Sequence, residues 1–366
     1  MKIIAVRTFS FVVVAIAATL GSLWAQAATA NQYFVASTGD DAASGSRLHP
    51  WKTLGRAAAA VTPGATVHVM PGTYSFDGEL KTEASGTPSA TIRYVSDQPW
   101  GAKLRSSKTA NSAVWWNRGD YVAIEGFDLS GAGALGIYNE GSHVQIIGNF
   151  IHDIPAPGCP AAGGAGILNG NHDASANDVI GNTVTGIGEL SLPCARVHGI
   201  YQTNAGGRIV HNTVVRSEGW GIHLWHAATG VLISDNLLLE NTRGGILVGA
   251  VASEFRDGNG KNSGTTVTHN VIVGSKTTDD TRAAYGVEQY GDVEHATITD
   301  NVVYGYRDGA VHAPGAEVSG NIEADPRVVP SNGTSSFALP SSSPACSGRW
   351  VHAACANAAK AKASLQ

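Results

Sequence analysis

The chain has 366 residues, of which 45 are glycine and only 14% are charged, with a formal net charge of −5. This acidic balance argues against a nucleic-acid partner, since such proteins neutralise phosphates with Lys and Arg. Self-similar segments run through most of the length. One stack of repeats therefore accounts for the chain better than separate globular cores.

Residues 1–30 have the pattern of a secretory signal peptide. Lys2 and Arg7 form a basic start, Phe9 to Leu23 is apolar, and Ala25–Ala27 and Ala28–Ala30 are both small-x-small cleavage motifs. The apolar run, roughly 15 residues, is short for a membrane span. An uncleaved anchor is the alternative. We expect a secreted or periplasmic protein with no membrane partner after cleavage, and a mature chain of 22 basic and 29 acidic residues.

Residues 31–62 are predicted to form an N-terminal cap. YFVAS predicts a strand, Gly39–Gly45 a polar loop, and Pro50–Val61 a helix with an apolar face. That face contains Trp51, Leu54, Ala58 and Val61. Such a capping helix would close the end of a stack and cover its edge strands. The strings ATVHVMPGTY, TIRYVSD and YVAIEGFDLS then predict the strands of the first coils.

Seven later apolar runs each carry an asparagine close to a glycine turn. These asparagines are Asn149, Asn182, Asn212, Asn236, Asn270, Asn301 and Asn321, at gaps of 33, 30, 24, 34, 31 and 20 residues. Periods of this length are typical of stacked coils, and an amide at a corner can bond both the next coil's amide and the turn backbone. We predict an all-β, single-stranded right-handed parallel β-helix over residues 63–330, followed by a C-terminal cap or tail over 331–366.

The distance from each ladder asparagine to the next corner glycine locates insertions. It is 8 or 9 residues in three coils but 16 or 17 after Asn149, Asn182 and Asn270. Two of these insertions lie on consecutive coils, about 4.8 Å apart, and hold Cys159 and Cys194. Four cysteines allow three connectivities. This placement favours the pair Cys159–Cys194, with Cys346 and Cys355 closing a short loop.

Stacking aligns equivalent residues of successive coils into columns on the outer surface. Around the corner glycines of the middle coils, these columns collect aromatic and titratable side chains: His198, Tyr201, Trp220, His223, Trp225, Glu288 and Tyr290. Aromatic faces beside polar groups suit a sugar-binding cleft, although each residue also has a structural alternative, such as a corner hydrogen bond. Arg196, Arg216 and Arg243 lie near the same corners and are candidates for binding a carboxylate, or else for surface salt bridges.

The N-terminal motifs resemble those of the pectate-lyase-like superfamily of right-handed parallel β-helix proteins. The matching residues are Gly39 to Gly45, Pro50 to Leu54 and Pro71 to Tyr74, and the resemblance continues to about residue 323. It implies a secreted polysaccharide lyase that acts on an acidic, uronic-acid-containing polysaccharide. Many such lyases use a Lys or Arg base and bind calcium. The few lysines of the coil region favour a His/Tyr pair, with no required cofactor and with Ca²⁺ as a possible ligand.

β-Elimination needs a group that blunts the uronate carboxylate, a base for the C5 proton and an acid for the leaving O4. We assign the first role to Arg196, Arg216 or Arg243. The base is His223 or His198, and Tyr201 is the acid or, with a lowered pKa, the base. Substrate contacts are predicted for Trp220, Trp225, Glu288 and Tyr290.

Three alternatives remain on the same scaffold. A glycoside hydrolase needs two carboxylates, for which Glu288 and Asp308 are candidates and Glu218 and Asp153 are less well placed. A uronate C5-epimerase shares the first step of the lyase. The third alternative is a glycan-binding or surface-adhesive β-helix without catalysis, against which stands the focusing of His and aromatic residues into two or three coils. The sequence predicts no metal site formed by protein side chains. We also expect the protein to be a monomer.

Overall fold

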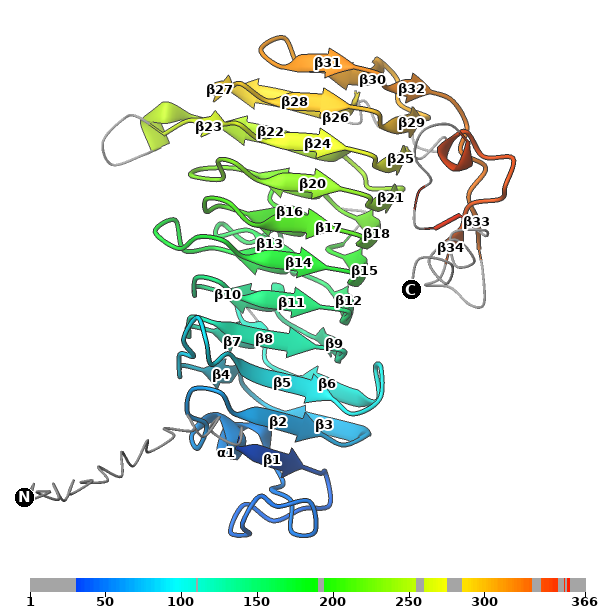
Figure 1. The fold of residues 1–366 in the computed structure, drawn as a ribbon. Coiled ribbons are helices and arrows are strands. Elements are labelled where there is room, and N and C mark those ends of the chain that lie inside the picture. Colours follow the sequence, from blue (N-terminus) through cyan, green and yellow to red (C-terminus); the bar gives the residue numbers. More distant parts are fainter. Residues whose placement is uncertain are drawn as a thin grey trace, which may run out of the picture. The chain divides into compact units, whose positions relative to one another are not determined.

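The described strands form three parallel sheets, to which successive turns of the chain contribute in order (Figure 1). The computed structural model describes residues 31–109, 111–189, 194–254, 260–274, 285–330, 337–347, 352, 354 and 355, all within one structural unit. The predicted signal peptide lies outside these residues, as do residues 275–284 of the insertion predicted after Asn270. No helix in the described ranges has the length and apolar character needed to cross a membrane.

Within those ranges, the strands follow chain order in each sheet. The eleven-stranded sheet consists of β1 (Gln32–Val35), β2 (Thr66–Val69), β5 (Ile92–Ser96), β8 (Val122–Glu125), β11 (Gln145–Ile147), β14 (Asp178–Ile180), β17 (Arg208–Val210), β20 (Leu232–Ser234), β24 (Thr266–Thr268), β28 (Thr297–Thr299) and β31 (Glu317–Ser319). The ten-stranded sheet consists of β3 (Gly72–Phe76), β6 (Ala102–Ser106), β9 (Asp128–Gly131), β12 (Phe150–Ile154), β15 (Thr183–Ile187), β18 (Thr213–Ser217), β21 (Leu237–Leu239), β25 (Val271–Val273), β29 (Val302–Tyr304) and β32 (Ile322–Glu323).

The nine-stranded sheet consists of β4 (Leu80–Thr82), β7 (Ala113–Asn117), β10 (Leu135–Asn139), β13 (Gly164–Asn169), β16 (Val197–Gln202), β19 (Trp220–Leu224), β22 (Gly244–Ala250), β26 (Tyr285–Gly291) and β30 (Gly309–His312). Short additional pairs are formed by β23 (Asn262–Ser263) with β27 (Val293–Glu294), and by β33 (Val329–Pro330) with β34 (Phe337–Ala338). Two short 3₁₀ helices cover Ala252–Glu254 and Pro344–Cys346.

The ladder asparagines occupy the corner between the eleven-stranded and ten-stranded sheets. The residue before each one has φ between 55° and 67°, and these residues are Gly148, Gly181, His211, Asp235, His269, Asp300 and Gly320. Gly adopts this left-handed conformation freely, and Asp and His adopt it more readily than most residues do. The corner therefore explains why Gly, His or Asp precedes each ladder asparagine.

The ladder itself is confirmed. The backbone N–H and the side-chain Nδ2 of Asn149 both donate to Oδ1 of Asn182, at 2.9 and 3.0 Å. The same pair of bonds repeats from coil to coil as far as Asn321. Each Nδ2 also donates to a backbone carbonyl, as Asn236 does to Ile209 at 2.8 Å. Every rung thus satisfies buried polar groups that a coil cannot satisfy alone.

A second amide ladder was missed from the sequence. Asn117 donates to Asn139, Asn139 to Asn169, and Asn169 to Gln202, at 2.9, 3.0 and 2.6 Å. These side chains end successive strands of the nine-stranded sheet. Glutamine replaces asparagine in the last rung and the flanking motif differs between coils, so the repeat was not visible as a string.

The predicted capping helix over residues 50–61 is wrong. Only α1 (Leu54–Ala58) is helical there, and no helix of seven or more residues occurs in the described part of the chain. Trp51 instead bridges Val35 in an extended conformation, and the Asp41 carboxylate accepts the N–H groups of Lys52 and of residue 53 at 2.8 Å. These bonds hold the segment before Leu54 outside a helix, so a single turn is left.

The segment after the last coil packs against the ten-stranded sheet, beside which β33 and β34 are drawn in Figure 1. Leu339, Ala345 and Cys355 contact a buried apolar cluster formed by Val215, Leu237, Leu239, Val271 and Val302. Cys346 and Cys355 form a disulfide, as predicted. The outer face of this sheet therefore has an apolar stripe that the C-terminal residues keep from water.

Candidate active site

An open cleft of about 770 Å³ lies on the outer face of the nine-stranded sheet. Residues of β16, β19, β22 and β26 line it together with residues 161–163 and 195–196, which belong to the two predicted insertions. The predicted site residues that line it are Arg196, His198, Tyr201, Trp220, His223, Trp225, Arg243, Glu288 and Tyr290. The structure thus brings nine sequence-predicted side chains together at one cleft.

The pairing register explains this convergence. Tyr201 pairs with His223, and one coil further Leu247 pairs with Glu288. The strand neighbours of these residues, such as Ile222, are fully buried in the interior. Because side chains alternate along a strand, the column that contains Tyr201, His223 and Glu288 faces the other way, toward the cleft.

The predicted column fails at its last position. Counting two residues after each corner glycine places Val311 beside Glu288, but Glu288 pairs with His312. The reason is that Gly309 pairs with Tyr285 and not with Gly286, so the coil is displaced by one residue.

His198 and His223 form a buried pair at the centre of the cleft floor. Nε2 of His198 lies 2.8 Å from Nδ1 of His223, and Nδ1 of His198 accepts the backbone N–H of Trp220 at 3.3 Å. Burial and, secondarily, Arg243 lower the pKa of His198 to about 3. Burial, then the charges of His198, His226 and Arg243, hold the pKa of His223 well below its usual value. Both rings are therefore neutral near pH 7.

Aromatic rings extend from this pair along the cleft. Tyr201 stacks on His223 with ring centroids 4.8 Å apart, and the ring centroid of Trp225 lies 5.4 Å from that of His223. Trp225 in turn stacks on Tyr290 at 5.7 Å, and 55% of Tyr290 is exposed. Trp220 differs, because it is only 6% exposed and its ring lies against Gly244, where a Cβ would come within 2.0 Å. Tyr290 thus offers an open face for a sugar ring, whereas Trp220 packs as part of the floor.

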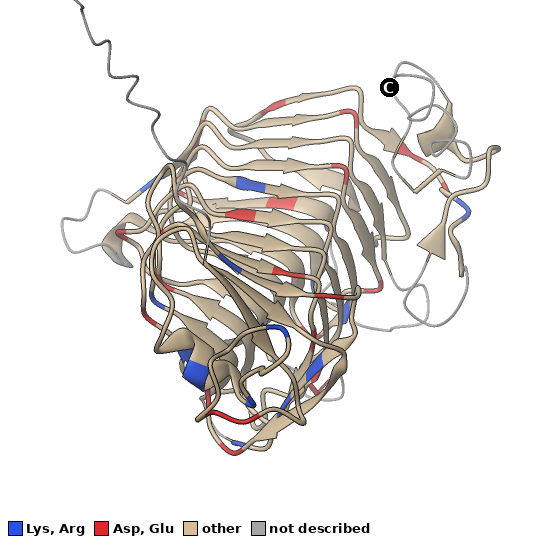
Figure 2. Cartoon of the chain, turned by 60° about the horizontal axis from the view of Figure 1, so that its bottom comes forward, with Lys and Arg blue, Asp and Glu red and all other residues tan. Residues whose placement is uncertain are grey.

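The charged side chains of the cleft are few. Burial raises the pKa of Glu288, while His312 and Arg243 oppose that rise. In the view of Figure 2, Lys and Arg are scattered over the coils. Attraction for an anionic ligand therefore depends on Arg243 and Arg196 at the cleft itself.

Arg216 is the predicted site residue that the structure places elsewhere. It lies on β18 of the ten-stranded sheet, with an exposed side chain and a φ of 52°. The sequence suggested the cleft because Arg216 precedes a corner glycine by only a few residues. The strand β18 ends before that corner, so its outward side chains belong to another face.

The loops beside the cleft are held by a disulfide and a buried carboxylate. Cys159 and Cys194 are bonded as predicted, with Cα atoms 5.5 Å apart. Glu218 is only 1% exposed, and its carboxylate accepts the N–H groups of Cys194 at 2.9 Å and Glu189 at 3.1 Å. Arg196 also donates to the carbonyl of Ala161 at 3.2 Å, which connects the two loops. Glu218 thus holds the loop in position, and its carboxylate is too buried to act as a catalytic group of a hydrolase.

One cleft residue was missed from the sequence. His226 lines the cleft and stacks on His172 with centroids 4.3 Å apart. Its φ of 56° places it at the sharp turn after β19. The string HLWH contained the signal, but only the turn geometry brings the second histidine back to the same side.

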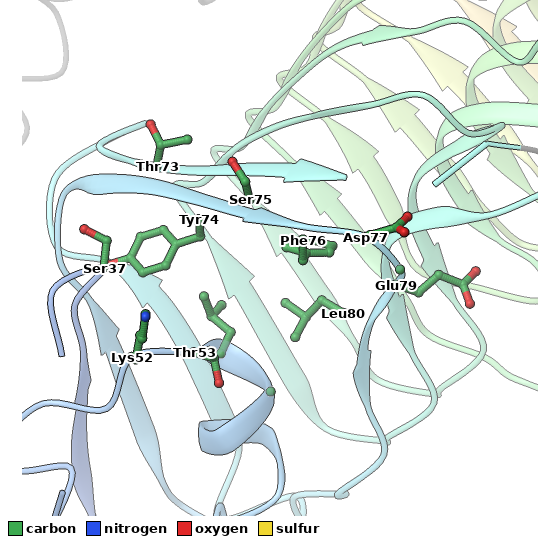
Figure 3. Close-up of a pocket in the computed structure, with 13 residues that line it drawn as sticks. Ser37, Lys52, Thr53, Thr73, Tyr74, Ser75, Phe76, Asp77, Glu79 and Leu80 are labelled. Atoms are coloured by element: carbon green, nitrogen blue, oxygen red, sulfur yellow. The ribbon is translucent and has the colours of Figure 1, made fainter. Parts of the chain in front are cut away.

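A smaller pocket of about 330 Å³ lies beside α1 (Figure 3). Tyr74, Phe76 and Leu80 give it an apolar lining, next to the carboxylates of Asp77 and Glu79. It contains neither His nor Arg, so it lacks the groups that neutralise a uronate and transfer a proton near neutral pH.

Metal ligands do not converge in the described residues. No group of three or more His, Cys, Asp or Glu side chains in these ranges is arranged to hold a metal ion. Calcium prefers six to eight oxygen ligands, and we derive no step through such an ion.

The three stacked parallel sheets form a right-handed parallel β-helix, and the resemblance of the N-terminal motifs is confirmed by a family match. Residues 33–187 match the family model described as Pel9A-like, right handed beta helix region. No curated protein matches the sequence significantly.

Several crystal structures are similar to this one. Pectate lyase Pel9A has 19% identity and a TM-score of 0.62, covering 80% of this chain and 79% of its own. XylC in complex with xylose has 12% identity and a TM-score of 0.51, covering 77% and 70%. An alginate lyase from Paenibacillus sp. str. FPU-7 has 20% identity and a TM-score of 0.46, covering 72% and 96%. At these identities the similarity to Pel9A and XylC shows a shared fold and assigns no activity.

Proposed function

We propose that the protein is a secreted polysaccharide lyase that cleaves a uronic-acid-containing polymer by β-elimination. The observation that carries this proposal is the cleft in which a neutral His223 stacks on Tyr201 and shares its lining with Arg243 and Arg196. A lyase needs these three kinds of group together: a proton donor, a proton acceptor and a cation for the carboxylate.

The proposed reaction begins with the polymer lying across Tyr290 and Trp225, whose stacked rings suit a pyranose face. The guanidinium of Arg243 binds the uronate carboxylate, which makes the C5 proton more acidic. One member of the Tyr201/His223 pair takes that proton. The C4–O4 bond then breaks, a C4–C5 double bond forms, and the leaving O4 receives a proton from the other member.

The same cleft supports a glycoside hydrolase less well than it supports a lyase. It requires two carboxyl groups on either side of the bond. Glu288 is the only carboxylate among the described residues that line the cleft, and Asp308 pairs with Arg307 at 2.7 Å as an exposed ion pair. Asp153 lies on β12 of the ten-stranded sheet.

The test is to incubate the mature protein with pectate, alginate, glucuronan and glycosaminoglycans, and to follow the ultraviolet absorbance of an unsaturated product. We expect one polymer to give a rise, and Tyr201→Phe and His223→Gln each to reduce kcat by roughly 10²–10⁴-fold. Arg216→Gln is the matched control and should leave the rate unchanged.

Other products would overturn the proposal. New reducing ends without the absorbance indicate a hydrolase, and altered sugar stereochemistry without cleavage indicates an epimerase. Binding without any product indicates a glycan-binding β-helix. Full activity of both Tyr201→Phe and His223→Gln would place the active site elsewhere.

A further inference from the structure

We infer that His198 is a positioning residue that fixes the tautomer of His223, so that His223 presents a proton on Nε2 and Tyr201 is left as the base. The tautomer itself follows from the hydrogen bonds alone. Its catalytic consequence rests on the proposed lyase function and decides which member of the Tyr201/His223 pair gives the proton.

The backbone N–H of Trp220 is the starting point for locating the protons of the two histidines. A peptide N–H is always a donor, and that of Trp220 points at Nδ1 of His198 at 3.3 Å, so this nitrogen carries no proton. A neutral imidazole has a single N–H, which must then be on Nε2 of His198. This N–H faces Nδ1 of His223 at 2.8 Å and donates to it. The remaining proton of a neutral His223 is therefore on Nε2.

A glycine makes this arrangement possible. A Cβ at Gly219 would lie 2.7 Å from Nδ1 of His198 and 2.3 Å from the carbonyl oxygen of Val197. Only a residue without a side chain allows the peptide of Trp220 to approach the imidazole this closely. The backbone and the ring thus form a built contact, which the opposite tautomer would turn into two donors facing each other.

The surroundings keep both rings neutral. His198 and His223 are 1% and 9% exposed, and the aromatic rings of Tyr201 and Trp225 lie beside His223. Arg243 and His226, which lie beside the pair, disfavour a positive charge on His223. Glu288 lines the same cleft, and burial favours its uncharged form.

Nε2 of His223 is buried and has no hydrogen-bond partner among the described residues. An unpaired buried donor is unfavourable, so an incoming substrate oxygen that displaces the covering side chains gains a ready partner there. Because Nε2 already bears its proton, His223 cannot accept the C5 proton in this state. Nε2 suits the leaving O4, to which it transfers its proton. Tyr201, stacked on His223, takes the C5 proton in its deprotonated form and becomes the neutral phenol.

The first test uses the intact protein without substrate, so its result is independent of the proposed function. Protein labelled with ¹⁵N-histidine is examined by two-bond ¹⁵N–¹H correlation spectroscopy at neutral pH, with His198→Gln and His223→Gln used for assignment. We expect both residues to be neutral with protonated Nε2 and unprotonated Nδ1. A protonated Nδ1 on His223, or an imidazolium at either position, would overturn the inference.

The second test separates positioning from folding. In His198→Gln the terminal amide can turn its oxygen or its nitrogen toward His223, so we expect mixed His223 tautomers and a fall in kcat of about 10²-fold with little change in KM. Gly219→Ala leaves both histidines in place but displaces the peptide, and should produce the same mixture. His49→Gln, at an exposed position in the N-terminal loop, is the control.

The two parts of the inference can fail separately. A pure Nε2–H tautomer of His223 in Gly219→Ala would show that Trp220 does not set it. A mixed tautomer together with unchanged kcat would show that His223 is not the proton donor, even if the protein proves to be a lyase.

Discussion

Arg243 and Arg216 both lie within a few residues before a corner glycine, yet they face different surroundings. Arg243 lines the cleft, and its charge acts on the pKa of His198, His223 and Glu288. We expect Arg243→Gln to raise KM for an acidic polymer by about 10–100-fold, since a lost hydrogen bond to a charged group costs about 1.5–3 kcal/mol. Arg216→Gln should change KM less than about twofold. Steady-state kinetics at low and moderate salt check this, and equal effects of the two variants would contradict the role of Arg243.

The ionisation of Glu288 predicts how KM depends on pH. Its pKa is raised by burial, so the carboxyl is neutral below that pKa and repels an anionic substrate above it. We expect KM to rise as the pH increases through this ionisation, and Glu288→Gln to remove the step while kcat is largely kept. The measurement is KM against pH for both proteins. A loss of kcat by 10²-fold or more in Glu288→Gln would instead indicate a catalytic carboxyl, as in a hydrolase.

At the scale of elements, the two disulfides close loops of different length at different places. The bond between Cys159 and Cys194 spans 35 residues and holds the loops beside the cleft, whereas Cys346–Cys355 spans 9 residues in the C-terminal segment. We expect Cys159→Ser/Cys194→Ser to lower the free energy of unfolding by about 4 kcal/mol and to raise KM. The Cys346→Ser/Cys355→Ser protein should lose about 3 kcal/mol and keep its KM. Urea unfolding and kinetics on both proteins test this, and an unchanged KM in the first would separate the loops from binding.

The main asparagine ladder predicts that a substitution lowers stability more at a buried rung than at the partly exposed last rung. Oδ1 of Asn236 accepts both the backbone N–H and a side-chain N–H of Asn212, so Asn236→Ala removes two buried hydrogen bonds. At about 1–3 kcal/mol for each, we expect a loss of roughly 2–6 kcal/mol. Asn321→Ala, at the partly exposed last rung, should cost less. Denaturant midpoints of the two variants provide the comparison, and equal losses would mean that burial of the rung does not matter.

At the scale of the molecule, buried neutral histidines predict loss of stability in acid. The pKa is lowered to about 3 for His198 and to about 4 for His352, in both cases chiefly by burial. The unfolded chain takes up these protons near pH 6.5, so the stabilisation is complete above that pH and is lost as the pH falls toward 4. His352→Gln should show a smaller drop in unfolding free energy between pH 7 and 4.5, by about 3 kcal/mol. An equal drop in both proteins would mean that His352 does not control this dependence.

The sequence by itself determined the coil, because the coil is defined by local features. The left-handed residue, the asparagine after it and the apolar run recur within a few positions, so the period, the strands and the partners of the cysteines could be inferred from spacing. The same periodicity aligned Tyr201, His223 and Glu288, since neighbouring coils pair in register.

Only the tertiary structure decided the features that depend on contacts between residues far apart in the sequence. The carboxylate of Asp41 reduced the predicted helix to α1, a one-residue shift moved the end of the column, and the position of β18 removed Arg216 from the cleft. The burial of His198 and its bond to the amide of Trp220 depend on a strand 22 residues further along the chain. Periodicity shows which residues share a face. Burial and the direction of each hydrogen bond, which determine protonation and therefore chemistry, arise only when the coils are packed.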